Sequence, residues 1–550
     1  MSAAQHTRTG QDEADVVVVG GGVNSLVAAA ELAGAGWSVV VVEAAPHLGG
    51  FIASGEVTAP GYLHDVYSSW HPLFVTGGAY AALGADLHRH GLEYANTDGP
   101  LTASVTDDGR VSLAHRDPAA TAAGFEHPED GRAYLKHLDD FGRRAAGIGG
   151  LLGSELRSPR ALGPVTALLR AGGPRDSEAL LRDAATSGRD WARREFRGHE
   201  VDHLWSPWLL HAGLSPDHAS GGLMMPVFAA TLHGAGLPVV VGGAGRFVEA
   251  FSRLLAERGV RVITGERVER VVVEGGRAVG VSLGGPSGGS VGGQILRARK
   301  AVLASVTPSA LYGSLLPAGS VKPQVTSEAE KFRHGRAAMQ VHVALSGPVP
   351  WSDARLRDVP LVHVSDGSGS TGIACAQAEA GLLPARPTVV VGQQHLLDAS
   401  RVPAGTAALW LQLQELPFTP SGDAAGLLDV SSGWTPELAR EYAGRALDRV
   451  AQHAPGLEAL VVGLHVISPV DLLAHNANAV AGDPYGGQAT IDQSYLWRPL
   501  PSSGRHRTPV PGLWHIGAST HPGPGLGAGS GHLVAQTLLR PSRRPRLRRP

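Results

Sequence analysis

The chain opens on apolar runs that alternate with an alanine-rich stretch of helical spacing. Residues 15–19 form a valine-rich run that predicts a buried strand, and three glycines follow at 20–22. A helix is expected to begin near Val23, and a second valine run ends at Glu43. Strand, tight turn, helix and strand in this order are typical of the βαβ start of an α/β domain.

The period of the apolar positions divides the rest of the chain. Residues 79–234 hold mostly helical stretches broken by glycine and proline, so we expect an inserted helical region there. Residues 238–281 return to α/β character, and 337–417 hold alternating and β-branched runs that predict a mixed sheet. Residues 510–539 again predict strand, glycine turns and helix, far from the first such unit.

Composition and charge narrow the class of protein. The 550 residues carry a net charge of −2 and 17% charged residues, which fits a globular protein and makes nucleic acid an unexpected partner. The single cysteine, Cys375, allows no intrachain disulfide, and no Cys/His spacing predicts a metal site. Because neither a signal peptide nor a membrane span is predicted, we expect a cytoplasmic protein.

The end of the chain is strongly basic. Residues 540–550 hold six arginines and three prolines, a composition that predicts disorder. This tail could contact an anionic membrane surface, at about 1 kcal/mol per charge, or it could remain solvated. Both interpretations stay open at this point.

The first glycine turn has the chemistry of a dinucleotide site. Gly20 permits the tight turn, and Gly22 lets the backbone approach a pyrophosphate at the N-terminus of the following helix. Ser25 takes the third position of the glycine fingerprint and is small enough for close packing of helix and strand. Glu43 follows about 20 residues after Gly22, the spacing at which a carboxylate meets a ribose hydroxyl.

A second glycine-rich turn and helix at the far end of the chain distinguish this protein from a nicotinamide dehydrogenase. The chain resembles the FAD-dependent phytoene desaturase and amine oxidase superfamily, and within it the phytoene-dehydrogenase-related proteins and desaturase-type carotenoid ketolases. The resemblance rests on GGGVNSLVAA from Gly20, PGYLHD and SWHPL within 60–73, GDPYGGQATIDQSYLWRPLP at 482–501, and PGLWHIGASTHPGPG at 511–525.

The resemblance implies an α/β fold with a Rossmann-like FAD-binding domain, discontinuous in sequence as in a GR2-type flavoprotein. A substrate domain of mixed β-sheet plus a helical insert completes this fold. The implied division is a disordered start at 1–14, FAD-binding parts at 15–78, 235–306 and 501–539, a helical insert at 79–234, a mixed-sheet substrate domain at 307–500, and a disordered basic tail at 540–550.

Non-covalent FAD is the cofactor that the resemblance implies. The residues that it places around FAD are Gly20, Gly22, Val23, Asn24, Ser25, Glu43, Ala44, Gly49, Gly50, Val268, Gly517, Ala518, Gly527, Ala528 and Gly529. Two positions depart from the family pattern. Phe51 stands where many relatives carry an arginine, and the strand expected at 339–345 lacks the lysine that amine oxidases place near the flavin. Gln340 or His342 would have to replace that lysine, which disfavours ordinary amine oxidase chemistry.

Candidate catalytic residues are three histidines and an aspartate. By resemblance, His521 follows the C-terminal glycine turn and is expected beside the flavin ring, where it acts directly or shapes the turn. His64, Asp65 and His71 lie in a segment expected to pass under the flavin. A structural, hydrogen-bonded role is the alternative for each of them.

The helical insert carries an apolar and aromatic group that could line a substrate tunnel or simply form core. Its members are Trp205, Trp208, His211 and Met225. Asp492 and Arg498 are expected to form a charge pair that orients the C-terminal FAD segment.

These residues predict an FAD-dependent oxidoreductase acting on a hydrophobic, polyene or secondary-metabolite small molecule. It would remove hydride from a C–H bond of that substrate and be reoxidised by oxygen or a quinone. An FAD-dependent amine oxidase of a small metabolite is one alternative. A non-catalytic escort protein with a flavin fold is the other.

Overall fold

The computed structural model describes residues 12–284 and 293–540. Residues 1–11 and 541–550 therefore lie outside the described residues, and with them most of the predicted disordered start and tail. The first strand, β1 (Glu13–Val19), begins two residues earlier than expected, so residues 13 and 14 belong to the sheet.

One of the two large sheets of the molecule has seven strands, drawn from the beginning, middle and end of the chain. Its order is β10-β11-β12-β1-β2-β9, with β20 paired to β12. The strands β20, β12, β1, β2 and β9 run parallel, whereas β10 and β11 add an antiparallel edge. The bounds of the other strands are β2 (Val39–Glu43), β9 (Arg261–Thr264), β10 (Val268–Glu274), β11 (Arg277–Leu283), β12 (Ile295–Ser305) and β20 (Leu513–Ile516).

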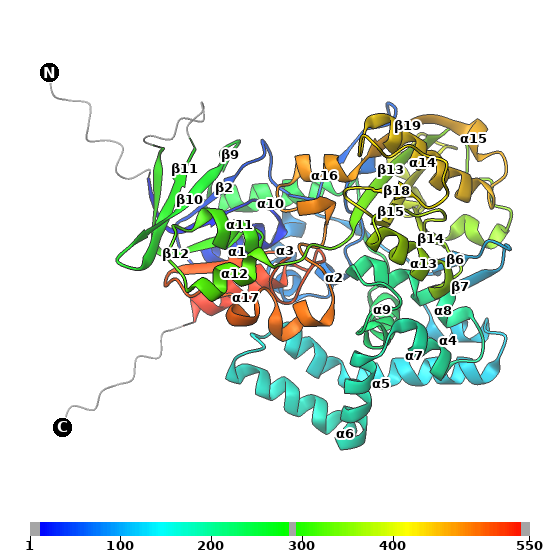
Figure 1. Cartoon of the computed structure of the whole chain (residues 1–550), viewed down its shortest axis with the longest axis horizontal. Helices are drawn as coiled ribbons and strands as arrows, with labels where there is room; N and C mark the ends of the chain where they lie inside the picture. The colour runs from blue at the N-terminus through cyan, green and yellow to red at the C-terminus, as the bar shows by residue number, and fades with distance from the viewer. Residues whose placement is uncertain (1–11, 285–292, 541–550) are drawn as a thin grey trace.

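Helices cover both faces of this sheet (Figure 1). They are α1 (Val23–Gly34), α3 (Gly78–Arg89), α10 (Gly245–Glu257) and α17 (Gly529–Leu539) on one face, and α11 (Pro308–Ala310) and α12 (Pro323–Glu330) on the other. Since successive strand residues point to opposite faces, Val16 and Val18 of β1 join the first of these cores, and Val17 and Val19 join the second. Burial on both sides explains the unbroken valine runs.

The second half of the molecule contains a mixed seven-stranded sheet in the order β19-β13-β17-β16-β14-β6-β7. Its strands are β6 (Pro100–Val105), β7 (Val111–His115), β13 (Ala337–Leu345), β14 (Leu361–Val364), β16 (Val389–Gly392), β17 (Ala407–Leu416) and β19 (Val461–Ile467). The helix α14 (Pro436–Ala451) packs on this sheet, and Thr435 caps it by accepting a hydrogen bond from the Leu438 N–H at 3.2 Å. Thr435 as the N-cap and Pro436 in the first turn are the residue types that favour a helix start.

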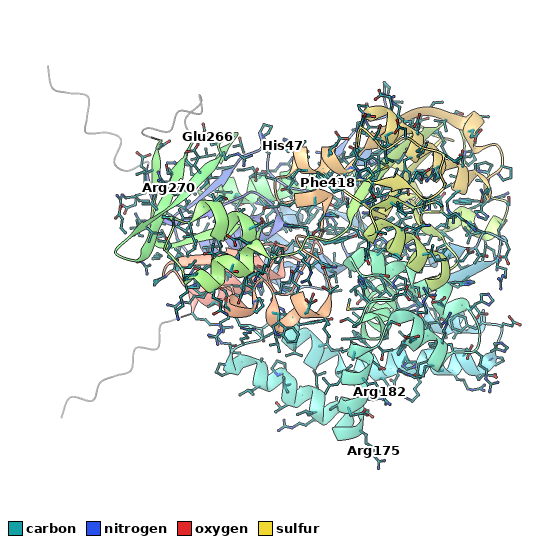
Figure 2. The ribbon with its side chains drawn as sticks, viewed as in Figure 1. His47, Arg175, Arg182, Glu266, Arg270 and Phe418 are labelled. Carbon is teal, nitrogen blue, oxygen red and sulfur yellow. The ribbon has the colours of Figure 1, made fainter. Side chains whose placement is uncertain are left out.

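A group of helices lies beside the second sheet and projects below it in Figure 1. Its members are α4 (Pro118–Ala123), α5 (Pro128–Leu152), α6 (Leu162–Ala185), α7 (Gly188–Glu195), α8 (Glu200–Trp205) and α9 (Gly221–Ala235). Apolar side chains of α4, α5, α7, α8 and α9 share a core with Leu101, Leu361 and Val390 of the second sheet, whereas none of the described side chains of α6 belongs to this core. Arg175 and Arg182 of α6 extend into solvent at the projecting end (Figure 2).

Short elements complete the fold. They are α2 (Pro72–Val75), α13 (Ser368–Glu379), α15 (Leu457–Leu460), α16 (Pro469–His475), and the strand pairs β3 (Ser54–Gly55) with β4 (His64–Asp65), β5 (Tyr94–Ala95) with β8 (Val239–Val240), and β15 (Leu382–Leu383) with β18 (Gly422–Asp423). The helix α13 was not anticipated inside the predicted mixed-sheet region. Among the described residues, none of the helices is both long and apolar enough to cross a bilayer.

The boundaries of the units differ from the sequence-based division in two places. The expected helical insert at 79–234 begins with α3, which packs in the first core, and it also supplies β6 and β7 to the second sheet. The expected mixed-sheet segment at 307–500 begins with α11 and α12, which cover the first sheet. Both differences arise from long-range packing, because these helices and strands bury their apolar faces against residues that lie far away in the sequence.

The contact between α1 and α17 gives a test of this fold. A Cβ added at Gly531 would lie 1.9 Å from the Asn24 carbonyl oxygen, so Gly531→Ala should force the two helices apart. We expect it to lower the free energy of unfolding by about 1–3 kcal/mol, the usual cost of overpacking. Gly142→Ala on α5 is the control, since its Cβ would meet no atom within 4 Å. Equal thermal midpoints for the two variants would contradict the close contact.

Candidate active site

A cavity opens where β1, β12 and β20 end, at the carboxyl edge of the parallel strands, the usual ligand position in such sheets. It continues to the face of the second sheet. Its lining residues are Gly22, Val23, Asn24, Gly49, Gly50, Phe51, Ile52, Tyr67, Ser68, His211, Ser305, Val306, Gln340, Gln412, Leu472, Asn476, Asn478, Pro484, Tyr485, Gly486, Gly517, Ala518, Ser519, Gly525 and Leu526.

The first wall of the cavity is the predicted glycine turn. Gly20 has φ +93° and donates its N–H to the Val42 carbonyl at 2.7 Å, which closes the turn after β1. A Cβ at Gly22 would meet no atom within 4 Å, so its backbone faces open space at the start of α1. The first N–H groups of a helix have no partner within the helix, and here they lie at the cavity wall. Ser25 is fully buried behind this wall.

A second glycine pair closes over the first. The Gly49 N–H donates to the Gly21 carbonyl at 2.9 Å, and a Cβ at Gly50 would lie 3.4 Å from the Cα of Gly22. Phe51 lines the cavity at the position where arginine was expected, and its ring lies near that of His475. His475 donates from Nε2 to the Gly50 carbonyl at 2.9 Å. Hydrogen bonds from backbone and imidazole therefore order this loop.

Glu43 ends β2 beside the glycine turn. Its carboxylate accepts hydrogen bonds from the Gly21 N–H at 2.5 Å and the Ala45 N–H at 2.7 Å. Neither Glu43 nor Ala44 lines the cavity itself, and Val268 begins β10 two residues after Glu266, whose N–H donates to the Glu43 carbonyl at 3.1 Å. The contact with ribose therefore stays a prediction for Glu43, as do the roles of Ala44 and Val268.

The C-terminal glycine segment forms the opposite wall. Gly517, with φ +105°, and Ala518 line the cavity directly after β20. The Gly517 N–H donates to the Ser530 hydroxyl at 3.1 Å, which ties the turn to α17. The expected residues Gly527, Ala528 and Gly529 do not line the cavity. They pack at the start of α17, where a Cβ at Gly529 would lie 2.8 Å from Pro522. Gly525 and Leu526 line the cavity in their place.

The predicted charge pair between Asp492 and Arg498 is wrong. Asp492 pairs with Arg333 at 2.6 Å near the surface. Arg498 is buried, and its guanidinium donates to the carbonyls of Ala518 at 2.8 Å and Tyr485 at 3.1 Å. Burial lowers the pKa of Arg498 to about 10. Arg498 thus supports the C-terminal wall through backbone carbonyls.

His521 does not face the cavity. Its Nε2 donates to the Leu151 carbonyl at the end of α5 at 3.0 Å, and its own carbonyl accepts from His506 at 2.7 Å. Burial lowers the pKa of His521 to about 4, so the ring is neutral near pH 7. This placement corresponds to the structural alternative, in which His521 fixes the turn against the helical insert.

His64, Asp65 and His71 are also built into the framework rather than the cavity wall. His64 hydrogen-bonds the Thr58 hydroxyl at 2.8 Å. The Asp65 carboxylate pairs with Arg401 at 2.8 Å, and both side chains are buried. His71 bonds the Tyr94 hydroxyl at 2.9 Å. Burial lowers the pKa of His64 to about 4 and that of His71 to about 3.

Of the four predicted substrate-pocket residues, one lines the cavity. Trp205, Trp208 and Met225 are buried in the core of the helical insert. His211 stacks on Trp208 with ring centroids 4.5 Å apart and presents its ring to the cavity. Its Nε2 lies 3.2 Å from Nε2 of His363 on β14, and burial lowers the pKa of His211 to about 3.

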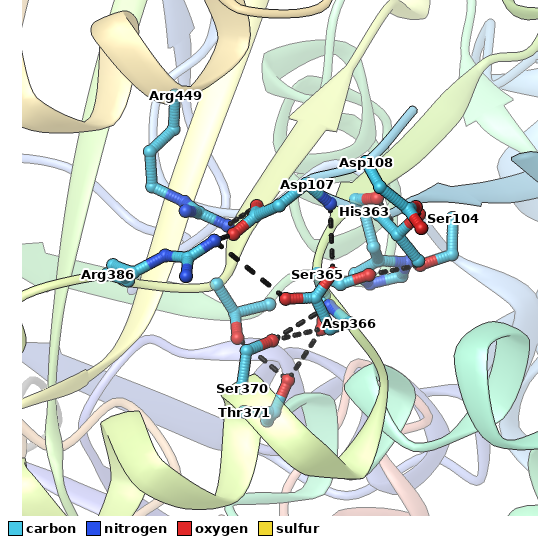
Figure 3. A network of polar contacts seen from close by, with 12 residues as sticks. Ser104, Asp107, Asp108, His363, Ser365, Asp366, Ser370, Thr371, Arg386 and Arg449 are labelled. Atoms are coloured by element: carbon cyan, nitrogen blue, oxygen red, sulfur yellow. Dashed lines mark hydrogen bonds and ion pairs between the residues drawn. The ribbon is translucent and has the colours of Figure 1, made fainter. Parts of the chain in front are cut away.

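A polar network holds the end of β14 (Figure 3). The Asp107 N–H, just after β6, donates to Asp366 at 2.9 Å, and its carboxylate pairs with Arg386 and with Arg449 at 3.0 Å. The Asp366 N–H in turn donates to the Ser370 hydroxyl at 2.8 Å. This network fixes β14 and hence His363, the partner of His211.

Several lining residues have no recognisable local signal in the sequence. Asn478 donates to the Ser305 carbonyl at 3.0 Å and accepts from the Thr307 N–H, so it joins the segments around the cavity floor. Gln412 reaches the cavity because β17 pairs with β13 in a register that sets it opposite Gln340. Such positions follow from strand pairing and could not be identified from spacing alone.

The cavity suits FAD. An anionic pyrophosphate is stabilised by the partly positive N-terminus of a helix, which α1 offers between Gly22 and Asn24. Open space at Gly22 and the near contact with Gly50 leave a backbone-lined cradle there. The second wall, around Gly517, lies across the same cavity and would border the ring system.

Comparisons with known proteins agree with this geometry. The chain matches the family described as flavin containing amine oxidoreductase over residues 26–528. The chain belongs to this family. This flavin oxidoreductase is 24% identical to pyridine nucleotide-disulfide oxidoreductase domain-containing protein 2 of Rattus norvegicus, over 96% of this chain and 94% of that protein. It is 26% identical to a zeta-carotene-forming phytoene desaturase of Myxococcus xanthus, over 95% and 93%.

Solved structures share the fold. An oxidoreductase from Methanosarcina mazei has a TM-score of 0.58 at 14% identity, over 95% of this chain and 99% of that one. The expected α/β flavoprotein fold is therefore confirmed. The protein is an FAD-dependent oxidoreductase of the desaturase and amine oxidase superfamily.

The role of Glu43 can be tested by FAD retention. We expect Glu43→Ala to weaken FAD binding by about tenfold or more, since it removes the acceptor for two backbone N–H groups and the predicted ribose ligand. The measurement is FAD titration of the apoprotein. Glu274→Ala, which removes a carboxylate from an exposed ion pair on β10, is the control. Unchanged FAD affinity in Glu43→Ala would refute the assignment.

The buried histidines predict how stability depends on pH. His64, His71, His211 and His521 have folded-state pKa values of about 4 or 3, below the unfolded value near 6.5. The unfolded chain therefore binds more protons below about pH 6.5. Their contribution to stability is fully present above that pH and is lost as the pH falls toward 4. Thermal midpoints should drop between pH 7 and 5, and a constant or rising midpoint would contradict neutral burial.

Proposed function

We propose that this protein removes hydride from a C–H bond of a hydrophobic, polyene-like or secondary-metabolite substrate. When bound, FAD would supply the two-electron acceptor for that hydride, with oxygen or a quinone as the final oxidant. The residues of the chain bind the substrate, orient the bond and exclude water. The named activity of the Myxococcus xanthus relative, desaturation of a carotenoid precursor, supports this substrate class.

The observation that carries the proposal is the uncharged wall of the cavity. Among the lining residues within the described part of the chain, none is Asp, Glu, Lys or Arg. His211 is neutral because burial lowers its pKa to about 3. Burying an ion without a partner is costly, so the part of the wall away from the α1 N-terminus favours a substrate that enters without charge.

Individual residues take non-chemical roles in this proposal. The walls at Gly22 and Gly517 position the FAD, and Phe51, Tyr67 and Leu526 supply apolar surface along the cavity. A hydride donor stabilised by conjugation needs no strong base, which is consistent with neutral side chains at the wall. Holding the reacting bond at the right distance is then the main contribution of the chain.

Amine oxidation is the less favoured enzyme activity. The strand β13 carries Gln340 at the cavity and no lysine anywhere between Ala337 and Leu345. The described lining residues also offer no carboxylate that could attract an ammonium group. An escort role without redox work is disfavoured by the family match and by the desaturase relative. Membrane contact through the arginine tail remains a proposal, and that tail lies outside the described residues.

Flavin bleaching tests the proposal directly. The purified yellow protein should lose its visible flavin absorbance when incubated without oxygen with a lipophilic polyene such as phytoene, and oxygen or a quinone should restore it. A small primary amine is the matched control and should leave the flavin oxidised. Bleaching by the amine alone would show that the protein is an amine oxidase. A colourless preparation that FAD cannot reconstitute would refute both the dehydrogenase and the amine oxidase activity.

A further inference from the structure

Three glutamine side chains form a polar row on the cavity side of the second sheet. Gln340 on β13 lies directly opposite Gln412 on β17, and Gln414 follows two residues later on the same face. Gln340 and Gln412 both line the cavity. All three are at least nine-tenths buried, at 2%, 8% and 3% exposure.

The amides of Gln340 and Gln412 make no hydrogen bond to any described residue. The Oε1 atoms of Gln340 and Gln414 are buried and have no partner within the part of the chain that the structure describes, although Gln414 donates from Nε2 to the Tyr485 hydroxyl at 2.6 Å. Buried polar groups in proteins are nearly always hydrogen-bonded. The unpaired Gln340 Oε1, beside the Gln412 amide at the cavity wall, therefore indicates a hydrogen-bonding ligand.

The groups around this row are polar and neutral. Tyr485 accepts from Gln414, which leaves its phenolic proton free for a ligand. His211 uses Nε2 toward His363, and its Nδ1 has no partner among the described residues. The chain just after His211 packs against Tyr485, because a Cβ at Gly213, two residues after His211, would lie 3.2 Å from the Tyr485 ring.

We propose that the substrate is an amphiphile whose otherwise apolar skeleton carries a neutral hydroxyl or oxo group, and that Gln340 and Gln412 bind that group. This inference rests on the proposed function and names its substrate class more narrowly. Each primary amide offers both donors and an acceptor, so the pair can satisfy an oxygen that accepts and also donates. A pure hydrocarbon would leave these amides unpaired.

Charged head groups do not fit the same site. Among the described residues that line the wall, none offers a carboxylate to pair with an ammonium group, and none is a lysine or arginine that could pair with a carboxylate. The glutamine amides can bind an ion only through their dipoles, which do not replace a counter-charge in a buried site. The site should therefore rank ligands as alcohol first and ammonium or carboxylate last.

A head-group series with one isoprenoid chain tests this ranking. Farnesol, farnesene, farnesylamine and farnesoic acid are titrated into the FAD-loaded protein, and binding is followed by tryptophan fluorescence and by the flavin difference spectrum without turnover. We expect farnesol to bind about tenfold or more tightly than farnesene, the effect of one to two hydrogen bonds. Equal affinities, or tightest binding of the amine or the acid, would overturn the proposal.

Variants assign the effect to the two amides. Gln340→Met and Gln412→Met keep the side-chain length but remove the amide. Each variant should therefore bind farnesol about tenfold more weakly and bind farnesene with unchanged affinity. Gln324→Leu is the control, because Gln324 is exposed on α12 and bonds only Glu328. Variants that lose FAD but keep the alcohol preference would show that the amides bind the flavin, and would overturn the inference.

The result is separable from that of the proposed function. Ligand binding is measured without flavin reduction, so a hydrophobic ligand series can rank as expected even if no substrate bleaches the flavin. If a Met variant fails to fold, the ligand series with the wild-type protein still tests the preference for a hydroxyl group, since it compares four ligands in one protein. Conversely, bleaching by a hydrocarbon with no alcohol preference would keep the proposed function and refute the amide site.

Discussion

The backbones of α1 and α17 approach so closely that only hydrogen fits at Gly531. The Gly531 N–H donates to the Asn24 side chain at 3.1 Å, and the buried Glu31 carboxylate accepts from His532 at 2.6 Å and Gln536 at 2.8 Å. Because the two helices carry the glycine turns that precede them, this contact brings the walls at Gly22 and Gly517 to one cavity. Segments about 500 residues apart thereby form a single nucleotide site.

The second sheet and the helical insert complete that cavity from the other side. His521 and His506 join the C-terminal turn to the end of α5, and Arg498 holds it through carbonyls. The His521 imidazole is neutral because burial lowers its pKa to about 4, whereas Arg498 keeps its positive charge and binds only carbonyl oxygens. On the side of the second sheet the cavity wall carries the neutral amides of Gln340 and Gln412, where recognition of a ligand is proposed.

Local patterns predicted the parts of the fold whose signal is local. The turn from Gly20 to Glu43 follows from the valine runs and the glycine chemistry, and the pattern at 510–539 correctly predicts β20 and α17. The pairing of β6 with β14 joins residues 259 apart, and no period in the sequence reveals it. For the same reason, the side chain of His521 could not be oriented, because the Leu151 carbonyl that binds it belongs to a distant helix.

Hydrogen exchange of the apoprotein before and after FAD addition tests the central claim that both ends of the chain build one nucleotide site. The account predicts simultaneous protection of the backbone amides at 20–25, 49–51 and 517–519, with no change on the exposed helix α6. Protection confined to the N-terminal turn, with 517–519 exchanging as before, would contradict it.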